Sequence, residues 1–214
     1  MPTIVLKDNK PGSTFYAPIN WMVTEGIAVG YTDGTFRSRR EITRGEVATM
    51  LYRYYAPEFT APEMSPFPDL SPDSAYYEAI TWMKSEGLVT GYANAEFRKD
   101  RNINRGEAAV ILDRMNPDTS FRYTGQPAFK DIDGRMSATH YSIYWLHWAG
   151  LADGYADGTF RPKDSISRGE FATVERLEGR TEDVLLDERV IRALELGLHA
   201  DGTSGKQRTN GCVV

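Results

Sequence analysis

The chain has 214 residues, a formal net charge of −5 and a pI near 5.3. This acidic balance argues against nucleic acid as the main partner, because phosphate binding needs a basic surface. No apolar run approaches the roughly 20 residues of a membrane span, and the single cysteine, Cys212, excludes an intramolecular disulfide.

Three copies of one pattern follow one another along the chain. Trp21, Trp82 and Trp145 are separated by 61 and 63 residues. Three further sets keep the same two intervals: Gly30, Gly91 and Gly154; Phe36, Phe97 and Phe160; and Arg44, Arg105 and Arg168. Such constant spacing predicts tandem repeats, which we place at 1–58, 59–118 and 119–179.

Each repeat is expected to begin with an amphipathic helix. In the first repeat this helix covers roughly residues 15–25, where Ile19, Met22 and Val23 recur at helical spacing. The matching apolar residues of the other repeats are Ile80, Met83, Ile143 and Leu146. Three glycines are placed to end these helices in the left-handed conformation: Gly26, Gly87 and Gly150.

A structured loop follows each first helix, with the sequences GYTDGTF, GYANAEF and GYADGTF. The Asp-Gly pairs of the first and third repeats predict tight turns fixed by Asp33 and Asp157. Repeat 2 has Asn94, Ala95 and Glu96 at these positions, so it loses the favoured pair and gains a carboxylate.

Other loop residues are candidates for ligand contact. Glycine permits close approach of a ligand to the backbone, which suggests this role for Gly30, Gly91 and Gly154. The tyrosines that follow them, Tyr31, Tyr92 and Tyr155, are expected to be half-buried between loop and helix. Trp21, Trp82 and Trp145 either stack on the apolar face of a sugar or fill the core. Asp8, Asp69 and Asp131 either cap the region before the first helix or accept hydrogen bonds from sugar hydroxyls.

The second helix of each repeat starts at ITRGE, INRGE or ISRGE. Thr43 is a good N-cap, and Glu46 three residues later completes a capping box, with Asn104 and Ser167 as the equivalent caps. The arginine between them is unfavourable, because a cation in the first turn opposes the helix dipole at a cost of roughly 0.3–1 kcal/mol. The following glycine costs up to about 1 kcal/mol against alanine in a helix interior.

The repetition of this arginine at one register indicates a shared role. One hypothesis is an anion site, in which free helix N–H groups and the guanidinium of Arg44, Arg105 or Arg168 point at the same acidic group. The alternative is an ion pair with a carboxylate of a neighbouring repeat.

Two other classes of function are disfavoured. The three histidines occupy no repeated register, and no Ser-His-Asp, paired-carboxylate or metal-ligand spacing stands out, so we expect no enzyme and no cofactor. The loops lack the dense alternating carboxylates of a calcium site.

The stretch AITWMKSEGLVTGYANAEFRKDRNINRGEAAVILDRM and its two counterparts resemble the S-layer homology (SLH) domain. That family has a helix ending before a Gly-Ile or Gly-Leu pair, a Gly-Tyr-x-Asp-Gly-Thr-Phe loop and an Ile-Thr-Arg-Ala-Glu helix start. The resemblance runs from about Leu6 to Leu177 and departs from the family at the glycine that replaces alanine in the helix-start motif.

The resemblance implies a mainly α fold, with three helix-loop-helix repeats in a pseudo-threefold spindle around a central three-helix bundle. It also implies non-covalent anchoring to an acidic secondary cell-wall polysaccharide of bacteria, often one with a ketal-linked pyruvate. The ligand would lie in grooves between repeats, with Arg44, Arg105 and Arg168 as its main contacts.

Several expectations concern the rest of the protein. Beyond the repeats we expect an amphipathic helix over 180–200 and a flexible tail over 201–214. The resemblance implies an extracellular location at the cell wall or surface layer, so a signal peptide was removed or Met1 was added for expression. The alternative functions are a self-assembling surface-layer component and the wall-targeting module of a phage or autolytic lysin.

Overall fold

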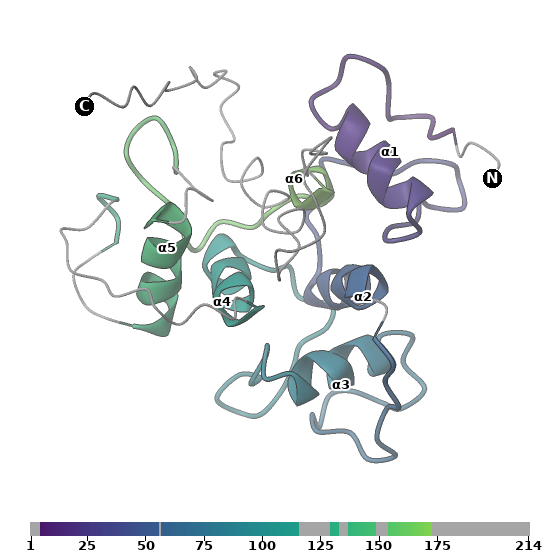
Figure 1. Ribbon diagram of the computed structural model, residues 1–214, viewed down its shortest axis with the longest axis vertical. Helices are drawn as coiled ribbons and strands as arrows, with labels where there is room; N and C mark the ends of the chain where they lie inside the picture. Colours follow the sequence, from purple (N-terminus) through teal and green to yellow (C-terminus); the bar gives the residue numbers. More distant parts are fainter. Residues whose placement is uncertain (1–4, 56, 116–128, 133–136, 149–153, 173–214) are drawn as a thin grey trace, which may run out of the picture.

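The computed structural model describes residues 5–55, 57–115, 129–132, 137–148 and 154–172 (Figure 1). In these ranges the fold is mainly helical, as expected, and its only β-structure consists of isolated bridges. The helices are α1 (Tyr16–Thr24), α2 (Arg44–Tyr55), α3 (Tyr77–Ser85), α4 (Arg105–Met115), α5 (Ala138–Trp148) and α6 (Arg168–Ala172). Each repeat contributes two consecutive helices, which confirms the helix-loop-helix reading.

The first helices bury the stripe that the sequence predicts. Ile19, Met22 and Val23 of α1 are at most 6% exposed. The matching residues of α3 and α5 are also buried: Ile80, Met83, Ile143 and Leu146. Gly26 ends α1 with φ of 73°, and the N–H of Ile27 donates to the Met22 carbonyl oxygen, so the predicted glycine cap forms.

Consecutive repeats are joined by helix packing. The second helix of repeat 1, α2, packs against α3 of repeat 2, and α4 packs against α5 of repeat 3. The last helix, α6, packs against α1, so the third repeat returns to the first (Figure 1). The three repeats therefore form a closed ring with three equivalent junctions.

Backbone hydrogen bonds between the repeats close a smaller ring. The N–H of Ile42 donates to the carbonyl oxygen of Ile166, Ile103 donates to Ile42, and Ile166 donates to Ile103. These isoleucines precede the second helices and are at most 2% exposed. The starts of α2, α4 and α6 are thus held together, which is compatible with a pseudo-threefold arrangement.

Some expectations lie outside the described residues. These are the Gly150 cap, the helix over 180–200 and the tail over 201–214. The description of α6 ends at Ala172, so the central three-helix bundle stays a prediction.

Candidate functional site

The capping box forms in all three repeats. The N–H of Glu46 donates to Thr43 Oγ1, and the Glu46 carboxylate accepts from the N–H of Thr43 at 2.9 Å. The same reciprocal bonds join Asn104 with Glu107 and Ser167 with Glu170. Each helix start thus fixes the position of its own glutamate side chain.

The helix N–H groups that follow the cap are already bonded. The N–H of Arg44 donates to the carbonyl oxygen of Arg101 at 2.9 Å, and that of Gly45 donates to Lys99 at 2.8 Å. The other two junctions repeat both bonds, with Asp164 and Pro162 or Arg40 and Ser38 as acceptors. The expectation of free N–H groups at an anion site was therefore wrong, because the loop of the next repeat occupies them.

The arginines of the helix-start motif are buried in the junctions. Arg44, Arg105 and Arg168 are 7%, 1% and 4% exposed. Their Nε–H groups donate to the carbonyl oxygens of Phe97 (2.9 Å), Phe160 (2.7 Å) and Phe36 (3.1 Å). Each arginine thus reaches into the loop of the repeat that follows it in the ring.

Two aromatic rings enclose each guanidinium. The Arg44 Cζ lies 4.9 Å from the ring centroid of Tyr92 and 4.6 Å from that of Phe97. Tyr155 and Phe160 enclose Arg105 in the same way, and Tyr31 and Phe36 enclose Arg168. This desolvated geometry favours cation–π attraction. The tyrosines are half-buried, as predicted.

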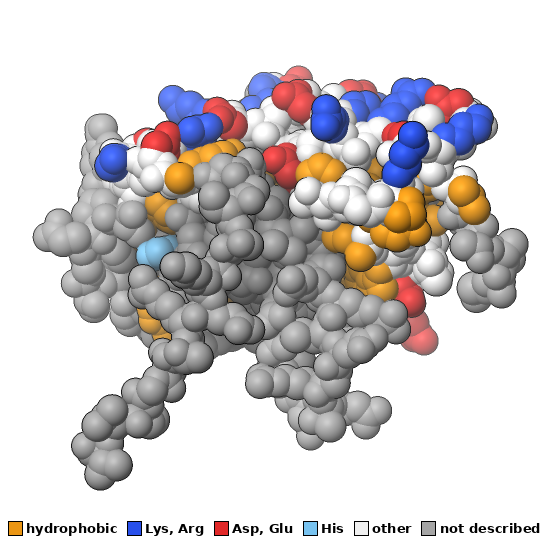
Figure 2. All heavy atoms as spheres, turned by 90° about the horizontal axis from the view of Figure 1, so that it is seen from above, with side chains coloured by type: hydrophobic (Ala, Val, Ile, Leu, Met, Phe, Trp, Pro, Cys, Tyr) orange, Lys and Arg blue, Asp and Glu red, His pale blue; other side chains and the backbone are white. Residues whose placement is uncertain are grey.

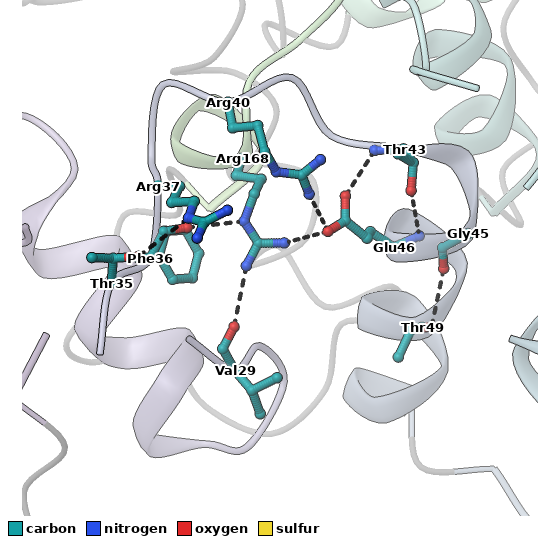
Figure 3. A network of polar contacts seen from close by, with 10 residues as sticks. All are labelled: Val29, Thr35, Phe36, Arg37, Arg40, Thr43, Gly45, Glu46, Thr49 and Arg168. Carbon is teal, nitrogen blue, oxygen red and sulfur yellow. Dashed lines mark hydrogen bonds and ion pairs between the residues drawn. The ribbon is translucent and has the colours of Figure 1, made fainter. Parts of the chain in front are cut away.

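A carboxylate lies beside the motif guanidinium at the junction of repeats 3 and 1 and at that of repeats 1 and 2. Arg168 Nη1 lies 2.9 Å from Glu46 Oε1, and its Nη2 donates to the Val29 carbonyl oxygen (Figure 3). Arg44 Nη1 lies 3.7 Å from Glu107 Oε1. The inter-repeat ion pair that the sequence left as an alternative is therefore present for Arg168 and Arg44.

A second arginine reaches the same carboxylates from the loops. Arg40 pairs with Glu46 and Arg101 pairs with Glu107, and their side chains are 35% and 42% exposed (Figure 3). Repeat 3 has Asp164 at this position. The first two glutamates therefore each face one buried and one exposed cation, which leaves a positive balance at the surface of these junctions.

Burial also affects the ionisation of the motif arginines. It lowers the pKa of Arg44 and Arg168 from the ordinary value, and the Glu107 and Glu46 carboxylates oppose that shift. Burial lowers the pKa of Arg105 as well. Because guanidinium groups are not deprotonated in proteins, all three stay charged at neutral pH.

The motif glycines are explained by packing across the junctions. A Cβ built on Gly169 would lie 2.8 Å from Phe15 Cδ2 and 2.9 Å from the Ser38 carbonyl oxygen. On Gly106 it would lie 2.8 Å from a methyl carbon of Thr139. The close approach that glycine permits is therefore to the neighbouring repeat.

The loops are fixed by carboxylates, as predicted for Asp33 and Asp157. Asp157 Oδ1 accepts from the N–H and hydroxyl of Thr159 at 3.0 and 2.6 Å, and Arg161 pairs with the other oxygen. These bonds lower the pKa of Asp157 to about 2. Asp33 makes the same contacts with Thr35 and Arg37, which also lower its pKa.

Another set of carboxylates holds each loop from its own repeat. Asp8 accepts from the N–H groups of Phe36 and Arg37, both at 2.7 Å. Asp69 and Asp131 make the equivalent pairs of bonds. These carboxylates therefore order the loops, a role that the sequence did not predict, and a sugar contact at them stays a prediction.

Side chains of the same repeat pack against the backbone of the three loop glycines. A Cβ on Gly30 would lie 2.7 Å from Leu6 Cδ2. On Gly91 and Gly154 it would lie 2.9 and 2.5 Å from the Cε1 atoms of Phe67 and Phe129. The close approach that these three glycines permit is therefore used by side chains of their own repeat, and a ligand contact at them stays a prediction.

Two of the three repeated tryptophans are buried and one is half-buried. Trp82 and Trp145 are 5% and 4% exposed, which favours the core alternative for both. Trp21 is half-buried and packs edge-on against Tyr54 at a centroid distance of 6.3 Å. Of the three, Trp21 alone has surface left for another contact.

Charged side chains are unevenly spread over the described part of the surface in the view of Figure 2. Figure 2 shows Lys and Arg side chains, with Asp and Glu between them, gathered along one side. Within the described residues, no helix is long and apolar enough to cross a membrane, and no group of three His, Cys, Asp or Glu side chains could hold a metal ion.

The loop residues Arg40 and Arg101 were missed as candidates by the sequence analysis. Both follow the loop phenylalanine by four residues, a register that could have been found by the same spacing argument. Repeat 3 has Asp164 at this position, so the arginine is not present in all three repeats.

Comparison with known proteins gives one family. A family model described as the S-layer homology domain matches residues 6–48, 66–109 and 128–172, which together are more than half of the chain. The three matched segments coincide with the three structural repeats.

Curated relatives point the same way. The chain is 33% identical over 154 residues to cell surface glycoprotein 1 of Acetivibrio thermocellus, covering 66% of this chain and 6% of that protein. It is 31% identical over 151 residues to the cellulosome-anchoring protein of the same organism, covering 66% and 32%. It is 27% identical over 160 residues to the surface-layer 125 kDa protein of Lysinibacillus sphaericus, covering 72% and 13%. The chain thus spans less than a third of the length of each.

Proposed function

Because the chain belongs to the S-layer homology domain family, we propose that it anchors a surface protein non-covalently to the bacterial cell wall. The ligand is an acidic secondary cell-wall polysaccharide, with ketal-linked pyruvate as one source of its charge, and the location is extracellular. The observation that carries this proposal is the threefold family match, supported by relatives that are named as surface and anchoring proteins.

The junctions between repeats are the proposed binding grooves. Each has a buried motif arginine beside a half-buried tyrosine, and two of them add the partly exposed side chain of Arg40 or Arg101. In this arrangement the motif arginines Arg44, Arg105 and Arg168 form the inner wall of a groove and maintain its positive potential. The partly exposed loop arginines and the tyrosine edges contact the sugar.

Separate grooves on one chain would act together. A long polysaccharide that occupies two grooves binds more tightly than one groove allows, because the second contact is intramolecular. Removing the grooves one at a time should therefore weaken wall binding step by step.

The test is a pull-down of the chain by purified bacterial sacculi, before and after the secondary polymer is stripped off. Retention that is lost on stripping supports the proposal. Retention that survives stripping would assign the ligand to peptidoglycan, and no retention would favour lattice assembly or a protein partner.

A further inference from the structure

A pocket of about 600 Å³ lies next to the junction of repeats 3 and 1. Its lining includes Ser13 and Thr14 before α1, and the loop run Arg37, Ser38, Arg39 and Arg40. The carbonyl oxygen of Ser38 accepts from the N–H of Gly169, which places the pocket beside the start of α6. This volume is in the range of small-ligand sites.

The charge of the lining is unbalanced. Its carboxylate, Asp8, already accepts two backbone N–H bonds. Arg37 pairs with Asp33 at 2.9 Å. Arg39 is exposed and has no ion-pair or hydrogen-bond partner within the described part of the chain. The lining thus holds three arginines and a single carboxylate, so the pocket carries net positive charge.

Arg40 adds a second available donor. It shares the single oxygen Glu46 Oε1 with Arg168, so two cations meet one carboxylate atom (Figure 3). In the described structure its Nε–H is buried without a hydrogen-bond acceptor. Buried donors are normally satisfied, so an unsatisfied one at a pocket indicates a missing acceptor.

The other repeats do not reproduce this chemistry. The run Arg-Ser-Arg-Arg of repeat 1 becomes Arg-Lys-Asp-Arg at 98–101 and Arg-Pro-Lys-Asp at 161–164. Each of these runs contains a carboxylate, whereas the run of repeat 1 has none. Repeat 1 therefore differs from the other two repeats at this pocket, and its loop run is the most positively charged of the three.

We propose that this pocket binds one anionic sugar residue, whose negative group is held by Arg39 and Arg40. Ser13, Thr14 and Ser38 also line the pocket, and we assign their hydroxyls to the neutral oxygens of the sugar. This inference rests on the proposed function and makes repeat 1 the preferred repeat for the acidic part of the polysaccharide.

The experiment is isothermal titration of the whole chain with three methyl glycosides. One carries a ketal-linked pyruvate, one carries a phosphate ester, and one is the neutral parent sugar. We expect one of the charged glycosides to bind and the neutral parent to bind at least about tenfold more weakly, since charge-assisted bonds are the stronger ones. Which charged glycoside binds distinguishes a carboxylate from a phosphate.

Two variants locate the site. Arg39→Ala removes an exposed, unpaired side chain and should weaken binding by roughly tenfold without changing the thermal unfolding curve. Lys163→Ala changes the equivalent exposed cation of repeat 3 and should leave affinity within about twofold, because Asp164 already opposes an anion there.

Equal affinity of Arg39→Ala and the unchanged chain would overturn the pocket, and so would equal losses in both variants. Absence of binding by all three glycosides would overturn it as well. The sacculus pull-down separates these failures. If sacculi retain the chain, only the pocket proposal is rejected and the proposed function stands. If they do not retain it, both proposals are rejected.

Discussion

The junction interiors and the surface loops differ in how closely the three repeats share their residues. Inside the junctions all three repeats keep the same buried arginine and the same glycine. At the loop tips, Asn94, Ala95 and Glu96 replace Asp-Gly-Thr, yet Ala95 adopts φ of 62°, close to the 81° of Gly34. A buried group has no solvent to replace a lost partner, whereas an exposed loop can reach one backbone shape with different side chains. The residues that stay identical in all three repeats at the junctions are therefore the buried ones.

The largest effect should come from breaking a junction. Arg105→Ala removes a side chain that is 1% exposed and that donates to the Phe160 carbonyl oxygen at 2.7 Å. We expect a loss of about 3 kcal/mol in the free energy of unfolding, measured by urea denaturation. Arg161→Ala, on the exposed loop of the next repeat, should cost less than about 1 kcal/mol. Similar losses in the two variants would contradict the distinction between interior and loop.

A smaller loss should follow from Gly169→Ala. The added Cβ meets the backbone oxygen of Ser38 at 2.9 Å, so the neighbouring loop must move, at a cost of about 1–3 kcal/mol. Gly45→Ala is the milder partner, since its closest contacts are at 3.1 Å. Thermal unfolding of both variants should rank Gly169→Ala as the less stable. A gain in stability for both would show that helix propensity outweighs the junction contact.

The loop tips should respond in opposite directions to reciprocal changes. Gly34→Ala places a side chain at φ of 81° and should cost about 1 kcal/mol, while Ala95→Gly relieves that strain and should stabilise by less than about 1 kcal/mol. Urea denaturation measures both. Destabilisation by Ala95→Gly would indicate that chain entropy, not backbone strain, controls the tip of repeat 2.

The smallest effect is expected from lowering the pH, which protonates Asp157. Hydrogen bonds to Thr159 and Arg161 lower the pKa of Asp157 from 3.8 to about 2. A lowered folded-state pKa means that this carboxylate stabilises the loop fully above about pH 4 and that the contribution is lost as the pH falls toward 2. An NMR titration of the Asp157 carboxyl carbon should give a midpoint near 2. A midpoint near 3.8 would show that these bonds do not persist in solution.

Asp157→Asn supplies the control for that titration. Asn94 holds the same place in repeat 2, where its Oδ1 accepts from the N–H of Glu96 at 3.3 Å. The variant should therefore keep the turn and lose its pH dependence below 4.

The sequence by itself determined the number of repeats, the helix order, the buried stripe of the first helices and the capping boxes. These features depend on local periodicity or on residues three positions apart, such as Thr43 and Glu46. The turn roles of Asp33 and Asp157 were also predictable, because their partners lie two and four residues away.

Only the tertiary structure decided what the motif arginines do. Arg168 meets Phe36 and Glu46, residues more than 120 positions earlier, so no local pattern could identify its partners. The same holds for the helix N–H groups, the motif glycines and the pocket at Arg39. The N–H groups and the glycines meet residues of a neighbouring repeat, and the pocket forms where residues 12–15 lie beside residues 37–40. Each of these contacts is a property of packing between segments that are distant in the sequence.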